Sequence, residues 1–401
     1  NRGYIGLGAG DEGYTNDFWE YDPYTSTWTQ KSNFPGSKRQ AGVAFAVILM
    51  FMQLGFQDAL FEDAITIHKT LKADLILISP KSVALFGTST FPLRRIYDAL
   101  EVDGVATASP FYLGGGQWKN PQNQSSRDII VLAFDPDKPI FNLTGVNQNL
   151  NTIRRADVVL FDRLSRSEFG PIATEFSKGQ VISTEIDGRK IRVGGLFSLG
   201  GGVMSADGLL ISSDLNFLRI RGGSLSEINL GLLTFEPGVN QEQVRQQLMT
   251  NLQEDVKVMT KQKFLDFEQN YWKKSSPIGF IFSVGLMMGV FIGGVIVYQI
   301  LYTDVTNHLA EYATLKAMGY PDWYLLKTVL QEALLLATLG FIPGLIISIG
   351  LYDLTKDAAR LPMATNPERV VFILGLTVLM CFVSGAIAVR KLRSVDPADI
   401  F

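Results

Sequence analysis

The chain has 401 residues, of which 47% are hydrophobic and 19% are charged, and its formal net charge is −3. So small a net charge, with no block of Lys and Arg, gives no electrostatic basis for nucleic-acid binding. The single cysteine, Cys381, excludes an intrachain disulfide and lies in an apolar run, where inert packing is expected. Charge is concentrated between about 58 and 275, and this segregation predicts a membrane protein with one large polar domain.

Residues 1–42 are rich in glycine and aromatic residues. The run GYIGLGAG is followed by DFWEYDP at 17–23, and Trp28 stands nine residues after Trp19. The pattern resembles one kelch repeat, in which Gly6–Gly10 forms a blade turn and not a dinucleotide site. Because one repeat cannot close a propeller, we expect a kelch-like fragment that does not fold alone and that marks a fusion or chimera. A kelch-type binding or oxidase module is an alternative that a single repeat disfavours.

Four later segments are apolar enough to cross a membrane, which takes about twenty residues. The first reads GVAFAVILMFMQLGF over 42–56, extends to Phe61 and has Lys38 and Arg39 as a basic flank. A buried or interfacial helix is the alternative for this segment, and Asp58 fits the outer membrane interface. The predicted spans are 43–61, 277–302, 328–352 and 370–389.

Small and polar residues within these spans predict how they pack. Gly285, Gly289 and Gly293 recur every four residues and form a stripe that lets another helix approach closely. Glu332 stands near the start of the third span. Pro343 lies inside that span and predicts a kink without a break.

The short loops set the orientation. The tail 390–401 is basic and is therefore expected in the cytoplasm, whereas the loop 353–369 balances its charges. Counting back, 303–327 is a cytoplasmic coupling loop and 62–276 is an extracytoplasmic domain.

The outer domain alternates short apolar runs with amphipathic ones, which predicts an α+β fold with mixed sheets. Together with the spans, this gives an α+β membrane protein with four helices and a large domain after the first. The predicted strands are 74–78, 128–134, 191–195, 209–211 and 229–235, and the predicted helices are 92–100 and 240–252.

Candidate catalytic or ligand-binding chemistry is sparse. The only histidines, His68 and His308, fall on opposite sides of the predicted membrane, which argues against a histidine metal site. No Walker A pattern occurs, so we expect no catalytic, cofactor or metal residues here, and any ATPase must be another chain. Asp135, Asp137, Asp157 and Asp162 look like turn and strand-end residues, and the triple-glycine runs 114–116 and 200–202 look like loops or hinges.

The segment 307–333, NHLAEYATLKAMGYPDWYLLKTVLQEA, is the most informative. A polar helix from His308 to Met318 meets Gly319 as its C-cap, and Tyr320-Pro321-Asp322 makes a turn before a second helix. The segment resembles the signature of FtsX/MacB-like permeases, a cytoplasmic E-x-x-x-L-K/R-A-x-G helix followed by Q/L-x-E-A. The matching residues are Glu311, Leu315, Lys316, Ala317, Met318, Gly319, Glu332 and Ala333.

Other segments resemble the DevC subfamily, the permeases of cyanobacterial exporters. The resemblance covers about 43–401 and rests on 48–61, 68–80, 108–121 and SVDPADIF at 394–401. It implies a homodimeric permease subunit in a bacterial inner membrane, with its large domain in the periplasm. The implied partners are a separate ABC ATPase, a membrane-fusion adaptor, an outer-membrane channel and membrane lipids.

The resemblance also implies a mechanism, in which ATPase closure moves a coupling helix and stalk helices carry the motion outward to export an amphiphile such as a glycolipid. The coupling element is Asn307–Tyr320 and the stalks are Phe264–Ser275 and Phe56–Leu71. Along the helix, Tyr312, Leu315 and Met318 share one face, and Glu311 and Lys316 lie at the rim of that face. Gly319 and Tyr320 follow at the end of the coupling helix. Two alternatives remain: a solvated connector, and an FtsX-type regulator that transmits ATPase cycles to an outer partner without moving a solute.

Overall fold

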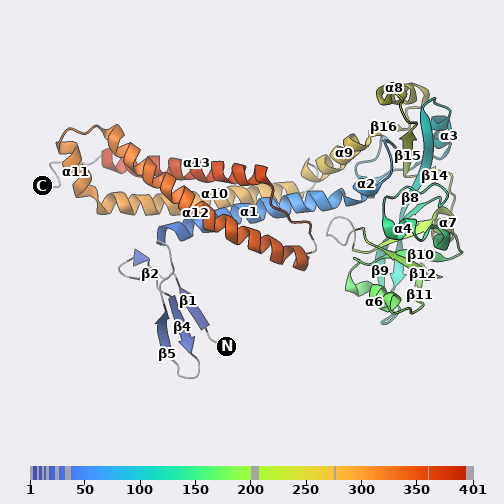
Figure 1. Cartoon of the computed structure of the whole chain (residues 1–401), viewed down its shortest axis with the longest axis horizontal. Helices are drawn as coiled ribbons and strands as arrows, with labels where there is room; N and C mark the ends of the chain where they lie inside the picture. The colour runs from blue at the N-terminus through green and yellow to red at the C-terminus, as the bar shows by residue number, and fades with distance from the viewer. Residues whose placement is uncertain are drawn as a thin grey trace. The chain divides into compact units, whose positions relative to one another are not determined.

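The computed structural model divides the chain into two compact units (Figure 1). One comprises Asn1–Asp58, Phe280–Ala358 and Met363–Phe401, and the other comprises Ala59–Gly279 with Ala359–Pro362. The structure describes residues 3–6, 9–10, 13–14, 18–22, 27–31, 38–199, 207–274, 277–359 and 361–393. The predicted hinge at 200–202 and the DevC-like tail 394–401 lie outside these residues.

The N-terminal region contains short strands. Strands β1 (Gly3–Gly6), β4 (Phe18–Asp22) and β5 (Thr27–Lys31) form an antiparallel sheet in the order β1-β4-β5. Strands β2 (Ala9–Gly10) and β3 (Gly13–Tyr14) pair with each other. Part of the predicted blade turn, residues 7–8, lies outside the described residues, and the kelch relationship stays a prediction.

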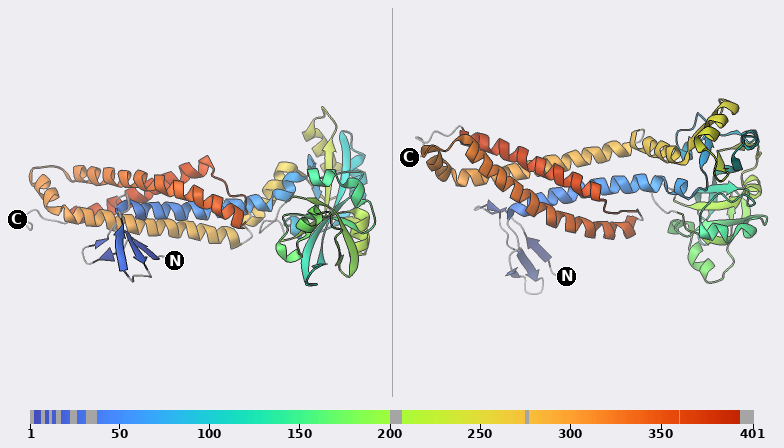
Figure 2. Two further views of the ribbon diagram at one scale, coloured as in Figure 1. Left: turned by 60° about the horizontal axis from the view of Figure 1, so that its bottom comes forward. Right: turned by 45° about the horizontal axis from the view of Figure 1, so that its top comes forward.

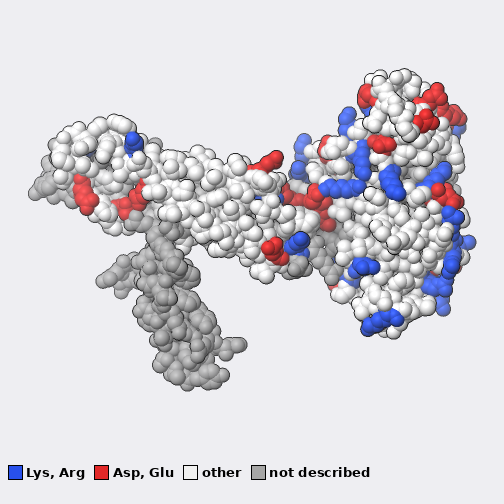
Figure 3. Space-filling view, viewed as in Figure 1, with Lys and Arg blue, Asp and Glu red and all other residues white. Residues whose placement is uncertain are grey.

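The helical unit is built from long apolar helices. They are α1 (Lys38–Ala64, whose end belongs to the other unit), α10 (Pro277–Asn307), α12 (Asp322–Ala359) and α13 (Pro367–Arg393). Among the described residues, four helical stretches are long and apolar enough to span a membrane, which confirms the predicted number of spans. These helices lie side by side in both further views (Figure 2). Charged residues gather toward the ends of the bundle, and its middle shows almost none on the visible face (Figure 3).

Close approach of small residues joins α10 to its neighbours. A Cβ placed on Gly293 would lie 2.6 Å from Ala46 Cβ of α1 and 2.6 Å from Met380 Sδ of α13. A Cβ on Gly285 would meet the Gln53 side chain at 2.5 Å, and one on Gly289 would stay 3.4 Å from Met50. The glycine stripe of α10 therefore faces α1 along its length.

Helices α12 and α13 each contain a residue that is unusual in a membrane helix, a proline in α12 and an arginine in α13. Helix α12 continues through Pro343, so the chain remains helical there as expected. Asp58 of α1 accepts a 2.7 Å hydrogen bond from Arg369 of α13, so this carboxylate, predicted at the outer membrane interface, has a cationic partner.

The second unit contains a nine-stranded mixed sheet in the order β11-β12-β10-β13-β9-β8-β15-β6-β16. The pairs β10–β12 and β13–β9 are parallel, and the other pairs are antiparallel. The predicted mixed α+β architecture is therefore confirmed. The strands are β6 (Leu75–Ile78), β8 (Val105–Lys119), β9 (Ser126–Phe134), β10 (Val158–Asp162), β11 (Ser183–Ile186), β12 (Arg189–Phe197), β13 (Leu209–Ser213), β15 (Leu230–Phe235) and β16 (Lys257–Thr260).

Helices cover both faces of this sheet, and β6 shows why its sequence is apolar throughout. Ile76 and Ile78 belong to one core cluster, and Leu75 and Leu77 belong to another, because alternate side chains point to opposite faces. The helices are α2 (Thr66–Thr70), α3 (Arg94–Leu100), α4 (Thr144–Asn147), α5 (Leu150–Ile153), α6 (Ile172–Ser177), α7 (Asp214–Arg221), α8 (Gln241–Asn251) and α9 (Lys261–Lys274). The smaller elements are β7 (Phe91–Pro92), which pairs with β14 (Glu227–Ile228), and the single 3-10 turns Leu85–Gly87 and Ser167–Phe169.

The glycine run 114–116 is not a loop or hinge, and that prediction was wrong. All three residues lie inside β8 and pair with β9. A Cβ on Gly114 would lie 3.0 Å from the Phe217 ring, and one on Gly116 would lie 2.7 Å from Ile186. The missing side chains at these glycines leave space for Phe217 and Ile186 to pack against the strand. Close approach of this kind explains glycine within a sheet.

Candidate functional site

The connection between α10 and α12 contains a short helix with a defined end. Helix α11 spans Leu309–Ala317, and Gly319 follows it with φ of +94°, a conformation that favours glycine. The Gly319 amide donates to the Lys316 carbonyl at 3.0 Å, and the Tyr320 amide donates to the Leu315 carbonyl at 3.1 Å. This pair of bonds is a Schellman motif, so Gly319 stops the helix and turns the chain sharply.

The start of α11 is tied to the end of α10. The His308 amide donates to the Asp304 carbonyl at 3.1 Å, and the His308 ring nitrogen Nδ1 lies 3.0 Å from the same oxygen. The Tyr312 amide then donates to the His308 carbonyl at 3.1 Å. Helix α11 is thus a hydrogen-bonded continuation of α10, bent at His308.

Four apolar side chains are exposed where α11 ends and α12 begins. Met318 is 63% exposed, Tyr320 43%, Trp323 60% and Tyr324 41%. We call these four residues the terminal patch. The Tyr320 and Tyr324 rings lie 4.8 Å apart, and the Lys327 ammonium lies 5.9 Å from the Trp323 ring. Clustered exposed aromatic and methionine side chains are typical of a protein-binding surface.

The predicted coupling face divides into an exposed and a half-buried part. Glu311 and Met318 are exposed, whereas Tyr312, Leu315 and Lys316 are half-buried. Burial raises the pKa of Tyr312, and the carboxylate of Glu332, also half-buried, raises it further. Tyr312 and Leu315 are therefore partly covered by neighbouring residues. Of the predicted face formed by Tyr312, Leu315 and Met318, Met318 alone is well exposed.

Sequence reasoning missed Trp323 and Tyr324. Their signal was present, because two adjacent aromatic residues directly follow a Pro-Asp turn, before the apolar part of α12. Exposed tryptophan and tyrosine at that position serve either a membrane interface or a partner surface.

The α/β unit holds a second arrangement, a buried polar cluster between α2 and α9. Glu268 is 1% exposed, and its carboxylate accepts hydrogen bonds from the Leu85 amide at 2.8 Å and from Trp272 Nε1 at 2.9 Å. His68, also 1% exposed, places Nε2 3.2 Å from the same carboxylate. We call His68, Leu85, Glu268 and Trp272 the stalk knot. The stalk knot links α2, in the predicted stalk Phe56–Leu71, to α9, in the predicted stalk Phe264–Ser275.

Two further contacts reinforce this junction. Lys261, at the start of α9, donates to the carbonyl oxygens of Lys69 at 3.1 Å and Leu71 at 2.6 Å. Burial lowers the pKa of Lys261, and Asp74 partly offsets that effect. Near the other end of α9, the Lys273 ammonium lies 5.6 Å from the Phe61 ring. Helix α9 is therefore held against α1 and α2 along its length.

Four aspartates, Asp135, Asp137, Asp157 and Asp162, lie in turns or at strand ends of the α/β unit. The Asp137 amide donates to Asp135 Oδ1 at 2.9 Å in a turn, and the Asp162 carboxylate accepts from the Leu164 and Leu199 amides at 3.1 and 3.3 Å. Asp157 has φ of +60° just before β10. Within the described part of the chain, no group of three His, Cys, Asp or Glu side chains is arranged to hold a metal ion.

Fold and span pattern together define a four-span membrane protein with one large mixed α/β domain. Residues 279–397, which include α11 and the terminal patch, match the family model described as FtsX-like permease C-terminal. This part of the chain is therefore similar to the C-terminal region of FtsX-like permeases.

A curated relative and two solved structures are also similar. The Macrolide export ATP-binding/permease protein MacB of Acinetobacter baylyi is 25% identical over 131 residues, which are 32% of this chain and 20% of that protein. The chain thus aligns with a fifth of that relative's length. The periplasmic region of MacB from Actinobacillus actinomycetemcomitans matches with 12% identity and a TM-score of 0.34, over 50% of this chain and 94% of that one. The extracellular domain of the noncanonic ABC-type transporter YknZ from Gram-positive bacteria matches with 15% identity and a TM-score of 0.32, over 47% and 100%.

Proposed function

We propose that this chain is the membrane-spanning permease subunit of an ABC-type exporter and that a separate ATPase subunit drives it through α11. The FtsX-like permease match over 279–397 supports the class of protein. The observation that carries the proposal is the terminal patch, which exposes four large apolar side chains on a helix end fixed by Gly319. Apolar and aromatic groups held rigidly at a surface are suited to docking into a pocket of a partner.

Under this proposal the α11 end is cytoplasmic, since Arg390, Lys391 and Arg393 at the end of α13 supply the positive charge expected on that side. Closure of the ATPase would push α11, and α10 would carry the push because its backbone bonding continues into α11. On the other side of the membrane, the stalk knot would keep α2 and α9 moving together. A buried, fully bonded carboxylate resists separation of the two segments better than a surface contact does.

The finer parts of the proposal come from the DevC resemblance. They are a homodimer in a bacterial, cyanobacterial-type inner membrane, a periplasmic adaptor with an outer-membrane channel, and export of an amphiphile such as a glycolipid by mechanotransmission. Copurification distinguishes this exporter from the FtsX-type regulator, because the exporter binds an adaptor and the regulator binds a cell-wall hydrolase.

The test is copurification from detergent-solubilised membranes, with the ATPase identified by mass spectrometry. Met318→Glu places a charge in the terminal patch and should reduce the recovered ATPase at least tenfold. Met249→Glu is the matched control, because Met249 is also exposed, at 56%, but lies on α8 of the α/β unit. Full recovery with Met318→Glu, or equal loss with both variants, contradicts the proposal.

A further inference from the structure

The α/β unit contains a hollow of about 340 Å³ beside the parallel pair of β10 and β12. Its apolar floor is formed by Val158, Val193 and Gly194 together with Phe176 and the 75%-exposed Val181, and the polar residues Thr152 and Gln180 also line it. A hollow of this size accommodates a compact organic molecule.

Two arginines, Arg155 and Arg192, line the same hollow, and its lining contains no aspartate or glutamate. Two arginines next to these in the sequence or the fold do have an ionic partner: Arg154 pairs with Asp137, and Arg189 pairs with Asp157. Among the described residues, no hydrogen bond or ion pair engages the side chain of Arg155 or Arg192. The hollow therefore combines an apolar floor with two guanidinium groups that have no anion.

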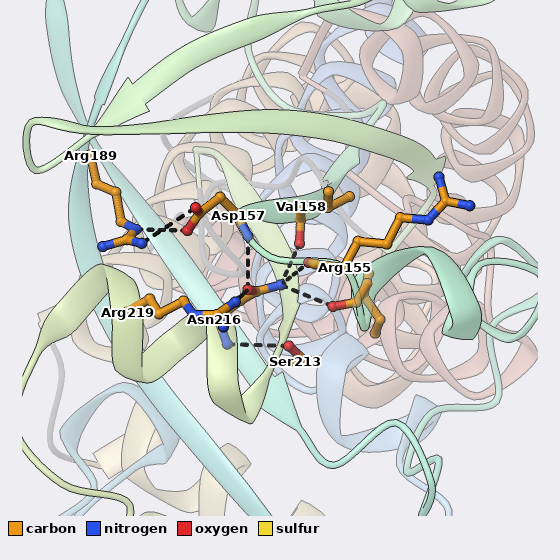
Figure 4. Close-up of polar contacts among 8 residues, drawn as sticks. Arg155, Asp157, Val158, Arg189, Ser213, Asn216 and Arg219 are labelled. Carbon is orange, nitrogen blue, oxygen red and sulfur yellow. Dashed lines mark hydrogen bonds and ion pairs between the residues drawn. The ribbon is translucent and has the colours of Figure 1, made fainter.

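Asp157, the carboxylate closest in sequence to Arg155, already has a cationic partner. Asp157 accepts hydrogen bonds from Arg189 at 2.7 and 3.3 Å, and Arg189 holds the pKa of Asp157 below its usual range. Figure 4 shows the Arg155 side chain extending away from Asn216 and from the Asp157–Arg189 pair. Arg155 is thus free to engage a ligand.

A buried side chain fixes the backbone that carries the first arginine. Asn216, 1% exposed, donates through Nδ2 to the carbonyl oxygens of Ile153, Arg155 and Val158 at 2.9, 2.9 and 3.0 Å. Its Oδ1 accepts from the Asp157 amide at 2.9 Å (Figure 4).

The backbone at Asp157 also fixes the main chain of the second arginine, Arg192. The Arg192 amide donates to the Asp157 carbonyl at 2.8 Å, and Arg192 stands opposite Val158 in the β10–β12 pair. Because the main chain at both arginines is held before any ligand arrives, little ordering of the backbone is needed on binding.

We propose that this hollow binds a small organic anion, a carboxylate or phosphate attached to a compact apolar group. A guanidinium donates two parallel hydrogen bonds to either anion, and the apolar floor receives the attached group. The site lies wholly within the α/β unit and needs no ATPase, so it stands or falls independently of the permease function.

The test uses the full chain in lipid nanodiscs, with benzoate and phenyl phosphate as probes and benzamide as the uncharged analogue, titrated by calorimetry at low ionic strength. Benzoate, phenyl phosphate or both should bind with a millimolar Kd, at least tenfold more tightly than benzamide. Arg155→Gln with Arg192→Gln should weaken anion binding at least tenfold. Added salt should weaken it too, because the two arginines are exposed.

Lys190→Gln is the matched control, since Lys190 is an exposed cation on β12 that does not line the hollow. Unchanged binding with Lys190→Gln and loss with the arginine variant support the site. Benzamide binding as tightly as benzoate, no binding of either anion, or equal loss with Lys190→Gln overturns it.

Discussion

Different kinds of contact stabilise the helical unit and the α/β unit internally. In the helical unit, α10 approaches α1 at glycine, where Gly293 faces Ala46. In the α/β unit, Glu268 and Asn216 are buried, and each is satisfied by several hydrogen bonds. Lipid tails are as apolar as the helices they surround, so membrane helices gain from close contact, whereas in a water-soluble core hydrogen bonds compensate a buried polar group for its lost hydration. Substitutions should therefore damage the two units for different reasons.

The largest effect is expected at the stalk knot. Glu268→Ala leaves the Leu85 amide, Trp272 Nε1 and His68 without their shared acceptor. Removing the shared acceptor of a buried hydrogen-bonded cluster costs about 3–5 kcal/mol. We expect the Tm of the α/β unit, followed by circular dichroism of the solubilised chain, to fall by roughly 10 °C.

Two variants control this measurement. Glu268→Gln keeps an acceptor oxygen and should lower the Tm less than Glu268→Ala does. Glu254→Ala removes an exposed glutamate and should leave the Tm nearly unchanged. A Glu268→Ala protein as stable as the wild type would show that the knot contributes nothing, and the contrast between the two units would fail.

A smaller effect is expected in the glycine stripe, and it should differ from one glycine to the next. Gly293→Ala places a methyl group 2.6 Å from the Ala46 Cβ, which is part of a rigid helix, so α1 and α10 must separate. Overpacking of this kind costs about 1–3 kcal/mol. Unfolding of the purified chain in SDS should therefore begin at a lower SDS fraction.

The neighbouring glycines supply the controls. Gly289→Ala finds its nearest atom at 3.4 Å and should be tolerated. Gly375→Ala, on α13, meets nothing within 4 Å and should stabilise the helix by up to about 1 kcal/mol. Equal effects at Gly293, Gly289 and Gly375 would mean that helix propensity, and not close packing, governs the bundle.

The span count and several strands were predictable because they rest on short-range patterns. Long, mainly apolar runs identify the four membrane helices, and LILI at 75–78 identifies a strand buried on both faces. The C-cap at Gly319 was also predictable, since its signal lies within one helical turn.

What could not be predicted depends on residues far apart in the chain. Glu268 looks like an ordinary charge on an amphipathic helix until folding brings His68 and Leu85 to it. Gly114 looks like a loop residue until Phe217 packs over it. The outward direction of Trp323 likewise depends on how α11 and α12 meet, and a sequence pattern does not fix that.

The smallest effect is expected from the exposed pair of Asp157 and Arg189, and its pH dependence identifies it. Arg189 lowers the folded-state pKa of Asp157, so the pair stabilises the fold above the unfolded-state pKa of about 3.9, and this contribution is lost as pH falls through the folded-state value. Arg189→Gln should thus lower the Tm of the α/β unit slightly at pH 7, since an exposed pair contributes little. The difference from the wild type should shrink below about pH 4, whereas Lys190→Gln should show no such trend. If the difference in Tm persists undiminished at low pH, Arg189 acts by packing its side chain and not by its charge. The α/β unit would then depend on polar pairing only where the paired groups are buried.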